Sequence, residues 1–174
     1  MLSVQYLHPG NFALVMATGI ISIGMGLLGN RMLADILFLF AVCAWIVLLA
    51  LSLLRLLRFA ARLRDELLNP RMVFSYFTLV AATNIVGLLL LDRGYSVSAI
   101  ACWAIAFGAW CSLLYLAFSV LTFLSHEHNV NIVHGGWLIT IVGTQSLVLL
   151  GSRIASALGP YAGYMMVEVH MLWG

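Results

Sequence analysis

Residues 8–29, HPGNFALVMATGIISIGMGLLG, contain the pattern that decides the fold of this chain. The stretch begins with a Pro-Gly turn and continues as an apolar segment without acidic or basic residues. Small or weakly polar residues recur at spacings of seven, four, four and three: Asn11, Thr18, Ser22, Gly26 and Gly29. These spacings place them on one helical face. An apolar helix with one small, polar face is typical of a membrane span that packs against other helices or a polar cavity.

The composition of the whole chain indicates a membrane protein. Of its 174 residues, 64% are hydrophobic and 8% are charged, and the mean hydropathy is +1.09. Soluble domains carry roughly 25% charged residues, so this chain could not cover its surface in water. At about 20 residues per span, the length accommodates five membrane helices and the start of a sixth. We expect an all-α polytopic bundle, a single transmembrane domain over residues 1–174.

The charge and the cysteines exclude other classes. The net charge is +2, and all eight basic residues are arginines. We expect no nucleic-acid partner, because the chain offers no soluble face for a basic patch. Cys43, Cys102 and Cys111 lie in apolar runs and are interpreted as buried small hydrophobic residues. No removable signal peptide is expected, because no basic residue precedes the first apolar run.

Five apolar segments are predicted to span the membrane. Their approximate bounds are 11–29, 34–57, 73–91, 97–124 and 136–157, with a partial sixth segment at 161–174. The last segment is too short to cross a bilayer. The chain is therefore expected to be truncated inside its sixth helix.

The loop after the second span is rich in arginine. It contains five of the eight arginines: Arg55, Arg58, Arg62, Arg64 and Arg71. The positive-inside rule places this loop, and with it the N-terminus, in the cytoplasm. The same segment is expected to form a short amphipathic helix on the membrane surface. A bacterial inner membrane is the expected location.

The first, third and fifth spans each carry a polar stripe. The second span is almost wholly aliphatic, and the fourth is dominated by aromatic residues, so the odd spans are expected to lie inside. The predicted path-lining residues are Thr18, Ser22, Gly26, Thr83, Gly87, Thr140, Gly143 and Thr144. The alternative is that these small residues serve close helix packing.

Several stretches suggest a family. Residues 8–12 (HPGNF) followed by 15–20 (VMATGI) resemble the opening of the tellurite-resistance and C4-dicarboxylate transporter family, which includes the slow-type anion channels. Residues 77–81, 136–138 and 144–146 are also similar. The resemblance implies a ten-helix fold of five hairpins whose inner helices ring a pore, with this chain as its first half. It also implies homotrimers.

The same resemblance implies transport of small anions, by a channel or a carrier. The candidates are chloride, nitrate, sulfite or a C4-dicarboxylate such as malate. The family's gating phenylalanine lies on a late inner helix, so no gate residue is assigned here. A hydroxyl-lined path without carboxylates agrees with anion transport, because carboxylates would attract cations. Neither enzymatic activity nor a cofactor is expected, because the spans hold no nucleophile–base pair or metal-ligand set.

The sequence leaves open two other functions and the role of one cluster of histidines. The chain could be a small non-transporting membrane subunit, or a haem-binding electron carrier. The second requires histidines on facing helices, and spans one to five contain none. His126, His128 and His134 follow the fourth span, where a metal site or a pH-sensitive role is conceivable. Glu168 and His170, in the partial sixth segment, are left undecided.

Overall fold

The computed structural model describes residues 8–69, 72–123, 137–157, 159 and 171. Every regular element in this part of the chain is helical. The long helices are α1 (Phe12–Leu27), α2 (Arg31–Arg58), α4 (Phe77–Leu91), α5 (Ser96–Phe123) and α6 (Leu138–Ala157). A short helix, α3 (Ala60–Leu67), follows α2, and the 3₁₀ turns η2 (Pro9–Asn11) and η3 (Val73–Tyr76) lead into α1 and α4.

Five helical segments are long and apolar enough to cross a membrane, as predicted. They are Pro9–Leu27, Arg31–Arg58, Val73–Leu91, Ser96–Thr122 and Leu138–Ala157. Their bounds lie within three residues of those expected from the sequence. The prediction of an all-α membrane helix bundle is therefore confirmed. The partial segment at 161–174 lies almost wholly outside the described residues.

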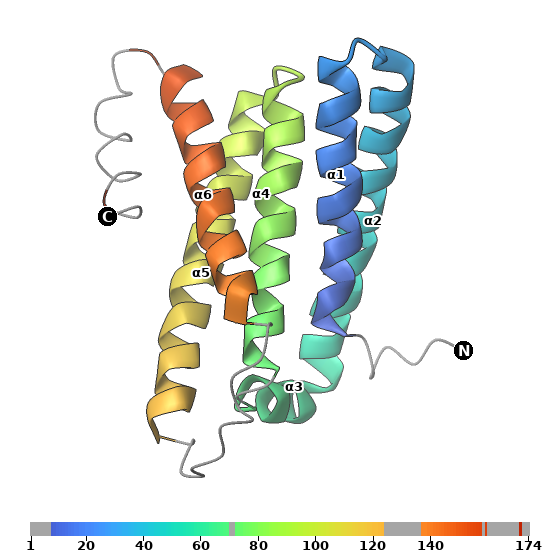
Figure 1. Ribbon diagram of the computed structural model, residues 1–174. Coiled ribbons are helices and arrows are strands. Elements are labelled where there is room, and N and C mark those ends of the chain that lie inside the picture. Colours follow the sequence, from blue (N-terminus) through green and yellow to red (C-terminus); the bar gives the residue numbers. More distant parts are fainter. Residues whose placement is uncertain (1–7, 70–71, 124–136, 158, 160–170, 172–174) are drawn as a thin grey trace.

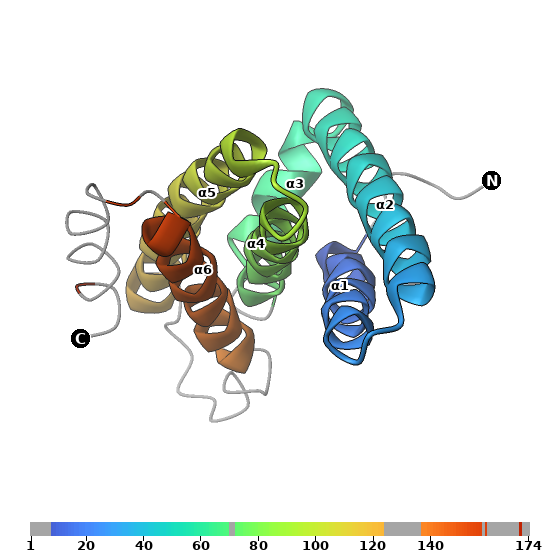
Figure 2. The ribbon, with the colours of Figure 1, turned by 90° about the horizontal axis from the view of Figure 1, so that it is seen from above.

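Helix α4 lies at the centre of the bundle, with α1 on one side and α5 and α6 on the other (Figure 1). Seen along the helices, α1, α4 and α6 form one row, and α2 and α5 lie behind it (Figure 2). Burial follows the same order. In the most apolar window of each helix, 78% of the residues are buried in α4, 39% in α6 and 22% in α1, against 17% in α5 and 6% in α2. The odd spans are thus the more buried ones.

Apolar contacts explain why α4 is central. On one face, Ala82 and Val86 pack with Phe12 and Val15 of α1. On another face, the cluster that contains Leu88 and Leu89 also takes in residues of α5 and α6: Trp103, Ala106, Leu147, Leu150 and Ile154. Because α4 has neighbours on nearly every side, little of its surface remains for lipid.

Local signals set the ends of the elements. The Nδ1 atom of His8 accepts a hydrogen bond from the backbone N–H of Gly10 at 3.0 Å, so His8 and Pro9 start the first helical turn. Asn30 caps α2 by accepting from the N–H of Leu33 at 3.2 Å. Gly29, with φ of +82°, makes the reversal between α1 and α2, a conformation that residues with a Cβ rarely adopt. We call the end of the bundle that holds residues 28–30 and 92–95 the turn end.

Helix α3 lies at the opposite end, which we call the α3 end, across the base of α2 and α4 (Figure 1). Glu66 connects it to both neighbours, because its carboxylate pairs with Arg55 and accepts from the Tyr76 hydroxyl. A short helix in the arginine-rich segment is thus confirmed, and its position on a membrane surface stays a prediction. His126, His128, His134, Glu168 and His170 lie outside the described residues.

Candidate transport path

The eight predicted path residues lie on three helices. Thr18, Ser22 and Gly26 are on α1, Thr83 and Gly87 are on α4, and Thr140, Gly143 and Thr144 are on α6. Ser22, Thr83, Gly87 and Gly143 are buried, and Gly26 is exposed. The three helices that carry these eight residues form one row, but the residues contact different neighbours. Those neighbours decide what each residue can do.

The two buried glycines lie at close helix contacts. A Cβ on Gly87 would lie 2.5 Å from Cδ2 of Leu150 and 3.2 Å from Cβ of Cys102. A Cβ on Gly143 would lie 3.3 Å from Cδ1 of Phe77. Both positions let helix backbones approach one another, which is the usual use of glycine in membrane bundles.

Three tryptophans on the back-row helices donate hydrogen bonds to the front row. The indole N–H of Trp45 on α2 reaches Oγ1 of Thr83 at 3.2 Å, and that of Trp110 on α5 reaches Oγ1 of Thr144 at 3.0 Å. Trp103 donates to the carbonyl oxygen of Leu147 at 3.1 Å. Each threonine also donates to the carbonyl four residues earlier in its own helix. The hydroxyls of Thr83 and Thr144 therefore face the back-row helices.

The other hydroxyls differ in how they are satisfied. Ser22 donates to the carbonyl oxygen of Ala34 on α2 at 2.7 Å, and Thr18 donates to that of Leu14 at 2.8 Å. The Oγ1 atom of Thr140 is buried and has no hydrogen-bond partner among the described residues. Thr140 is thus the stripe hydroxyl with free bonding capacity in this part of the chain.

A polar pair lies in the middle of the bundle. Asn84 is fully buried, and its Nδ2 donates to Oγ of Ser146 on α6 at 3.0 Å. Ser146 in turn donates to the carbonyl oxygen of Gly143 at 2.6 Å. The Oδ1 atom of Asn84 has no partner among the described residues. The pairing of Asn84 with Ser146 could not be predicted, because a sequence does not give the register between two helices.

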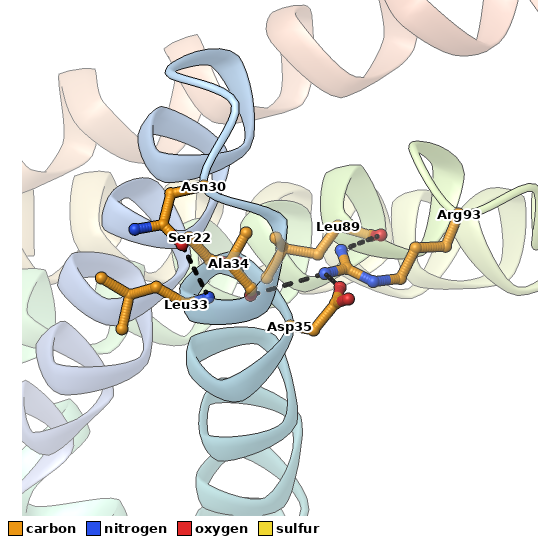
Figure 3. Close-up of polar contacts among 7 residues, drawn as sticks. All are labelled: Ser22, Asn30, Leu33, Ala34, Asp35, Leu89 and Arg93. Atoms are coloured by element: carbon orange, nitrogen blue, oxygen red, sulfur yellow. Dashed lines mark hydrogen bonds and ion pairs between the residues drawn. The ribbon is translucent and has the colours of Figure 1, made fainter.

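Two path residues line a hollow of about 520 Å³ near the turn end. Ser22 and Gly26 contribute from α1, and the hollow also has charged walls: Arg31, Asp35, Asp92 and Arg93. Figure 3 shows the Arg93 guanidinium reaching from the end of α4 to the start of α2. There it contacts Oδ1 of Asp35 at 2.7 Å and the carbonyl oxygen of Ala34 at 3.5 Å. Its Cζ also lies 3.7 Å from the ring centroid of Phe38.

Ion pairs connect three helices at the turn end. Arg93 pairs with Asp35, and the adjacent Asp92 pairs with Arg153 of α6 at 2.8 Å. A basic residue at this end runs against the predicted sidedness. The ion pair with Asp92 explains why Arg153 is nevertheless found there. Sequence reasoning missed both pairs. The signal in the sequence was the dipeptide Asp92-Arg93, which lies in a short turn between two apolar spans. A charged residue in such a turn can pair with a charged residue at the same end of a neighbouring helix.

The structure shows where the three cysteines lie and which acidic, histidine and cysteine side chains are close together among the described residues. Cys102 is buried, as expected, whereas Cys43 and Cys111 are exposed on α2 and α5, so the interpretation of all three as buried was wrong. Both exposed thiols lie on the back-row helices, which have open faces. Within the described ranges, no three His, Cys, Asp or Glu residues gather as a metal site. The three loop histidines lie outside those ranges.

The fold and the buried polar contacts define a polytopic α-helical membrane protein. A family model described as voltage-dependent anion channel matches residues 6–174, which is nearly the whole chain. The chain therefore belongs to the voltage-dependent anion channel family, and the family resemblance seen in the sequence is confirmed. Members of this family are channels or transporters of anions and not enzymes. No curated protein and no solved structure gives a match.

Proposed function

We propose that this chain supplies helices to a path that carries small anions across a membrane. The observation that carries the proposal is the family match over residues 6–174. The charge distribution supports it, because α1, α4, α5 and α6 contain no aspartate or glutamate. Carboxylates at membrane depth would attract cations and repel anions.

The proposed path follows the polar stripes of α1, α4 and α6. Ser22 and Gly26 support it at the turn end, where they border a polar hollow. Its charged walls are two arginines and two aspartates that lie near the membrane surface: Arg31, Arg93, Asp35 and Asp92. Thr140 supports it on α6, since its hydroxyl has spare bonding capacity. Thr18, Thr83, Gly87, Gly143 and Thr144 complete the proposed set, either by lining the path or by setting the spacing of the helices that line it. Hydroxyls bind anions weakly, which suits conduction.

The finer assignments belong to the same proposal. Chloride, nitrate, sulfite and a C4-dicarboxylate such as malate are the candidate substrates. The protein is proposed to be a single transmembrane domain that assembles as a homotrimer in a bacterial inner membrane, with its N-terminus in the cytoplasm. The arginine excess at the α3 end supports this sidedness.

The test is uptake of each candidate anion by lipid vesicles that contain the full-length protein. Gly26→Leu fills the hollow, and the nearest neighbour of a Cβ there is 3.9 Å away, so the fold should tolerate the change. Gly24→Leu is the matched control, because a Cβ at Gly24 meets nothing within 4 Å and Gly24 does not border the hollow. We expect Gly26→Leu to lower uptake several-fold and Gly24→Leu to leave it unchanged. Cation-selective currents, or no uptake of any candidate anion by folded protein, would contradict the proposal.

A further inference from the structure

A second hollow, of about 380 Å³, lies between α2 and α5 near the α3 end. Most of its lining surface is apolar, with leucines from α2, α3, α4 and α5: Leu49, Leu53, Leu56, Leu63, Leu79 and Leu113. Leu53 and Leu56 are exposed, as is Ser112 on α5, so the hollow opens sideways between the two back-row helices. It borders none of the eight path residues. It therefore needs a separate explanation.

The end of this hollow nearest α3 has a polar boundary. Arg55, which is only 3% exposed, lines it together with Tyr76. Both side chains bind Glu66, since Arg55 forms a salt bridge with one carboxylate oxygen and the Tyr76 hydroxyl donates to the other at 3.0 Å. This paired boundary separates the apolar hollow from the charged surface of α3. The hollow is thus mostly apolar, apart from Ser52 and Ser112, and its charged boundary lies at one end, as the charge of a lipid does.

The surface beyond that boundary is basic. Residues 55–66 contain four arginines and two acidic residues, a net charge of +2. Arg58 and Arg64 are exposed there. Clusters of arginine beside a membrane helix attract anionic lipid headgroups. The charge next to the hollow therefore complements a negatively charged headgroup.

We propose that this hollow binds one acyl chain of an anionic phospholipid, with the phosphate lying over Arg58 and Arg64. Its position between two outward-facing helices gives it direct access to the hydrocarbon of the bilayer. A single acyl chain is an extended run of methylene groups and needs a far narrower groove than an α-helix, which is about 10–12 Å across.

The test uses phosphatidylglycerol that carries a photoactivatable diazirine in its acyl chain, in vesicles with the full-length protein. Cross-linked peptides are then mapped by mass spectrometry. We expect labels on α2 and α5 at residues that line the hollow. Ala109→Phe and Ser112→Trp add bulk to the hollow and should reduce labelling several-fold. Ala104→Phe and Ser98→Trp are matched controls on the exposed surface of α5 outside the hollow, and they should not change it.

The headgroup is tested with a paired variant and a second probe. Arg58→Gln with Arg64→Gln should weaken labelling by the phosphatidylglycerol probe, whereas Arg31→Gln at the turn end should not. Equal labelling by a phosphatidylcholine probe would contradict the proposed preference for an anionic headgroup. Unchanged labelling in folded Ala109→Phe and Ser112→Trp proteins would overturn the site. A disulfide between two Ser112→Cys protomers, in a background without native cysteines, would show a second copy in the hollow and also overturn it.

Discussion

Thr83 and Thr144 show how polar side chains are accommodated inside this bundle. Each hydroxyl donates to its own helix and accepts from a tryptophan of a neighbouring helix. Both bonding roles of the hydroxyl are thereby used without water, which matters because an unpaired polar group in hydrocarbon costs several kcal/mol (roughly, by transfer data). The tryptophans serve as connectors between the back and front rows.

Gly87 provides the sharpest test of close packing. Replacing it with valine would place the new side chain against Leu150 and Cys102. We expect Gly87→Val to lower the free energy of unfolding by about 1–3 kcal/mol, the usual cost of overpacking. Reversible unfolding in mixed detergent micelles measures the change.

Gly108→Val is the matched control for this prediction. Gly108 is an exposed helical glycine on α5, and a Cβ there meets nothing within 4 Å. Its effect should stay within roughly 0.5 kcal/mol, as for other surface positions. Equal effects of the two substitutions would show that helix propensity, and not the contact with α6, sets the cost at Gly87.

Sequence reasoning found the small-residue stripes but not the direction of each side chain. The spacing of Thr18, Ser22 and Gly26 indicates a shared face, and the structure keeps them on one helix. Which neighbour meets that face depends on the rotation of each helix about its axis, and several rotations satisfy the same spacing. The Trp45–Thr83 contact therefore could not be predicted.

Among the elements, α2 and α4 are opposites. Beyond Arg31 and Asp35 in its first turns, helix α2 has no charged, hydroxyl or amide side chain from residue 36 to residue 51, and it is the least buried. Helix α4 carries Thr78, Thr83 and Asn84 and is the most buried. The polar content of each span predicted this contrast, because a buried helix can satisfy polar groups and a lipid-facing one cannot. The bounds were predicted equally well, since hydropathy changes sharply at each membrane surface.

Helix α3 depends on Glu66 for its attachment. Glu66→Gln removes the charge that pairs with Arg55 while keeping the size of the side chain. We expect α3 to open more easily by about 1–3 kcal/mol, because the mostly buried guanidinium loses its counter-charge. Faster amide hydrogen exchange at residues 60–67 measures this opening.

Asp65→Asn makes the same change of charge one residue earlier. Asp65 is exposed, and its replacement should leave exchange in α3 nearly unchanged. If both variants speed exchange equally, net charge and not the Arg55–Glu66–Tyr76 contact holds the helix in place.

At the scale of the whole molecule, charged contacts fasten the bundle at both ends. At the turn end, Asp35, Arg93, Asp92 and Arg153 join α2, α4 and α6. At the α3 end, Glu66 joins α2, α3 and the start of α4. The apolar middle between them contains mainly neutral hydrogen bonds. This distribution fits a bilayer, since charges are tolerated best near its surfaces.

The sidedness of the protein can be tested with single cysteines. In a background without Cys43, Cys102 and Cys111, position 64 and position 95 are both exposed and lie at opposite ends of the bundle. We expect an impermeant maleimide to label Tyr95→Cys in intact cells and Arg64→Cys only after the membrane is opened. The reverse pattern would invert the proposed topology.

The overall arrangement was predictable only in part. The spans, the inner position of the odd spans and the family followed from the residues, whereas the ion pairs at Arg93 and Arg153 did not. The two pairs join the turn after α4 to residues of α2 and α6 that are 58 and 61 positions away in the chain. Such contacts depend on how hairpins are placed side by side, and no local pattern records that placement.

The Asn84–Ser146 pair has a consequence for how the protein folds during its synthesis. The two partners are 62 residues apart, so at about 5–20 residues per second the ribosome needs roughly 3–12 s to make the second after the first. During that interval the amide of Asn84 is in the nascent chain without its final partner. The first hairpin, which is already complete, can receive α4 through Trp45 and Thr83 at once. The order of translation thus matches the order in which the polar groups of α4 become satisfied.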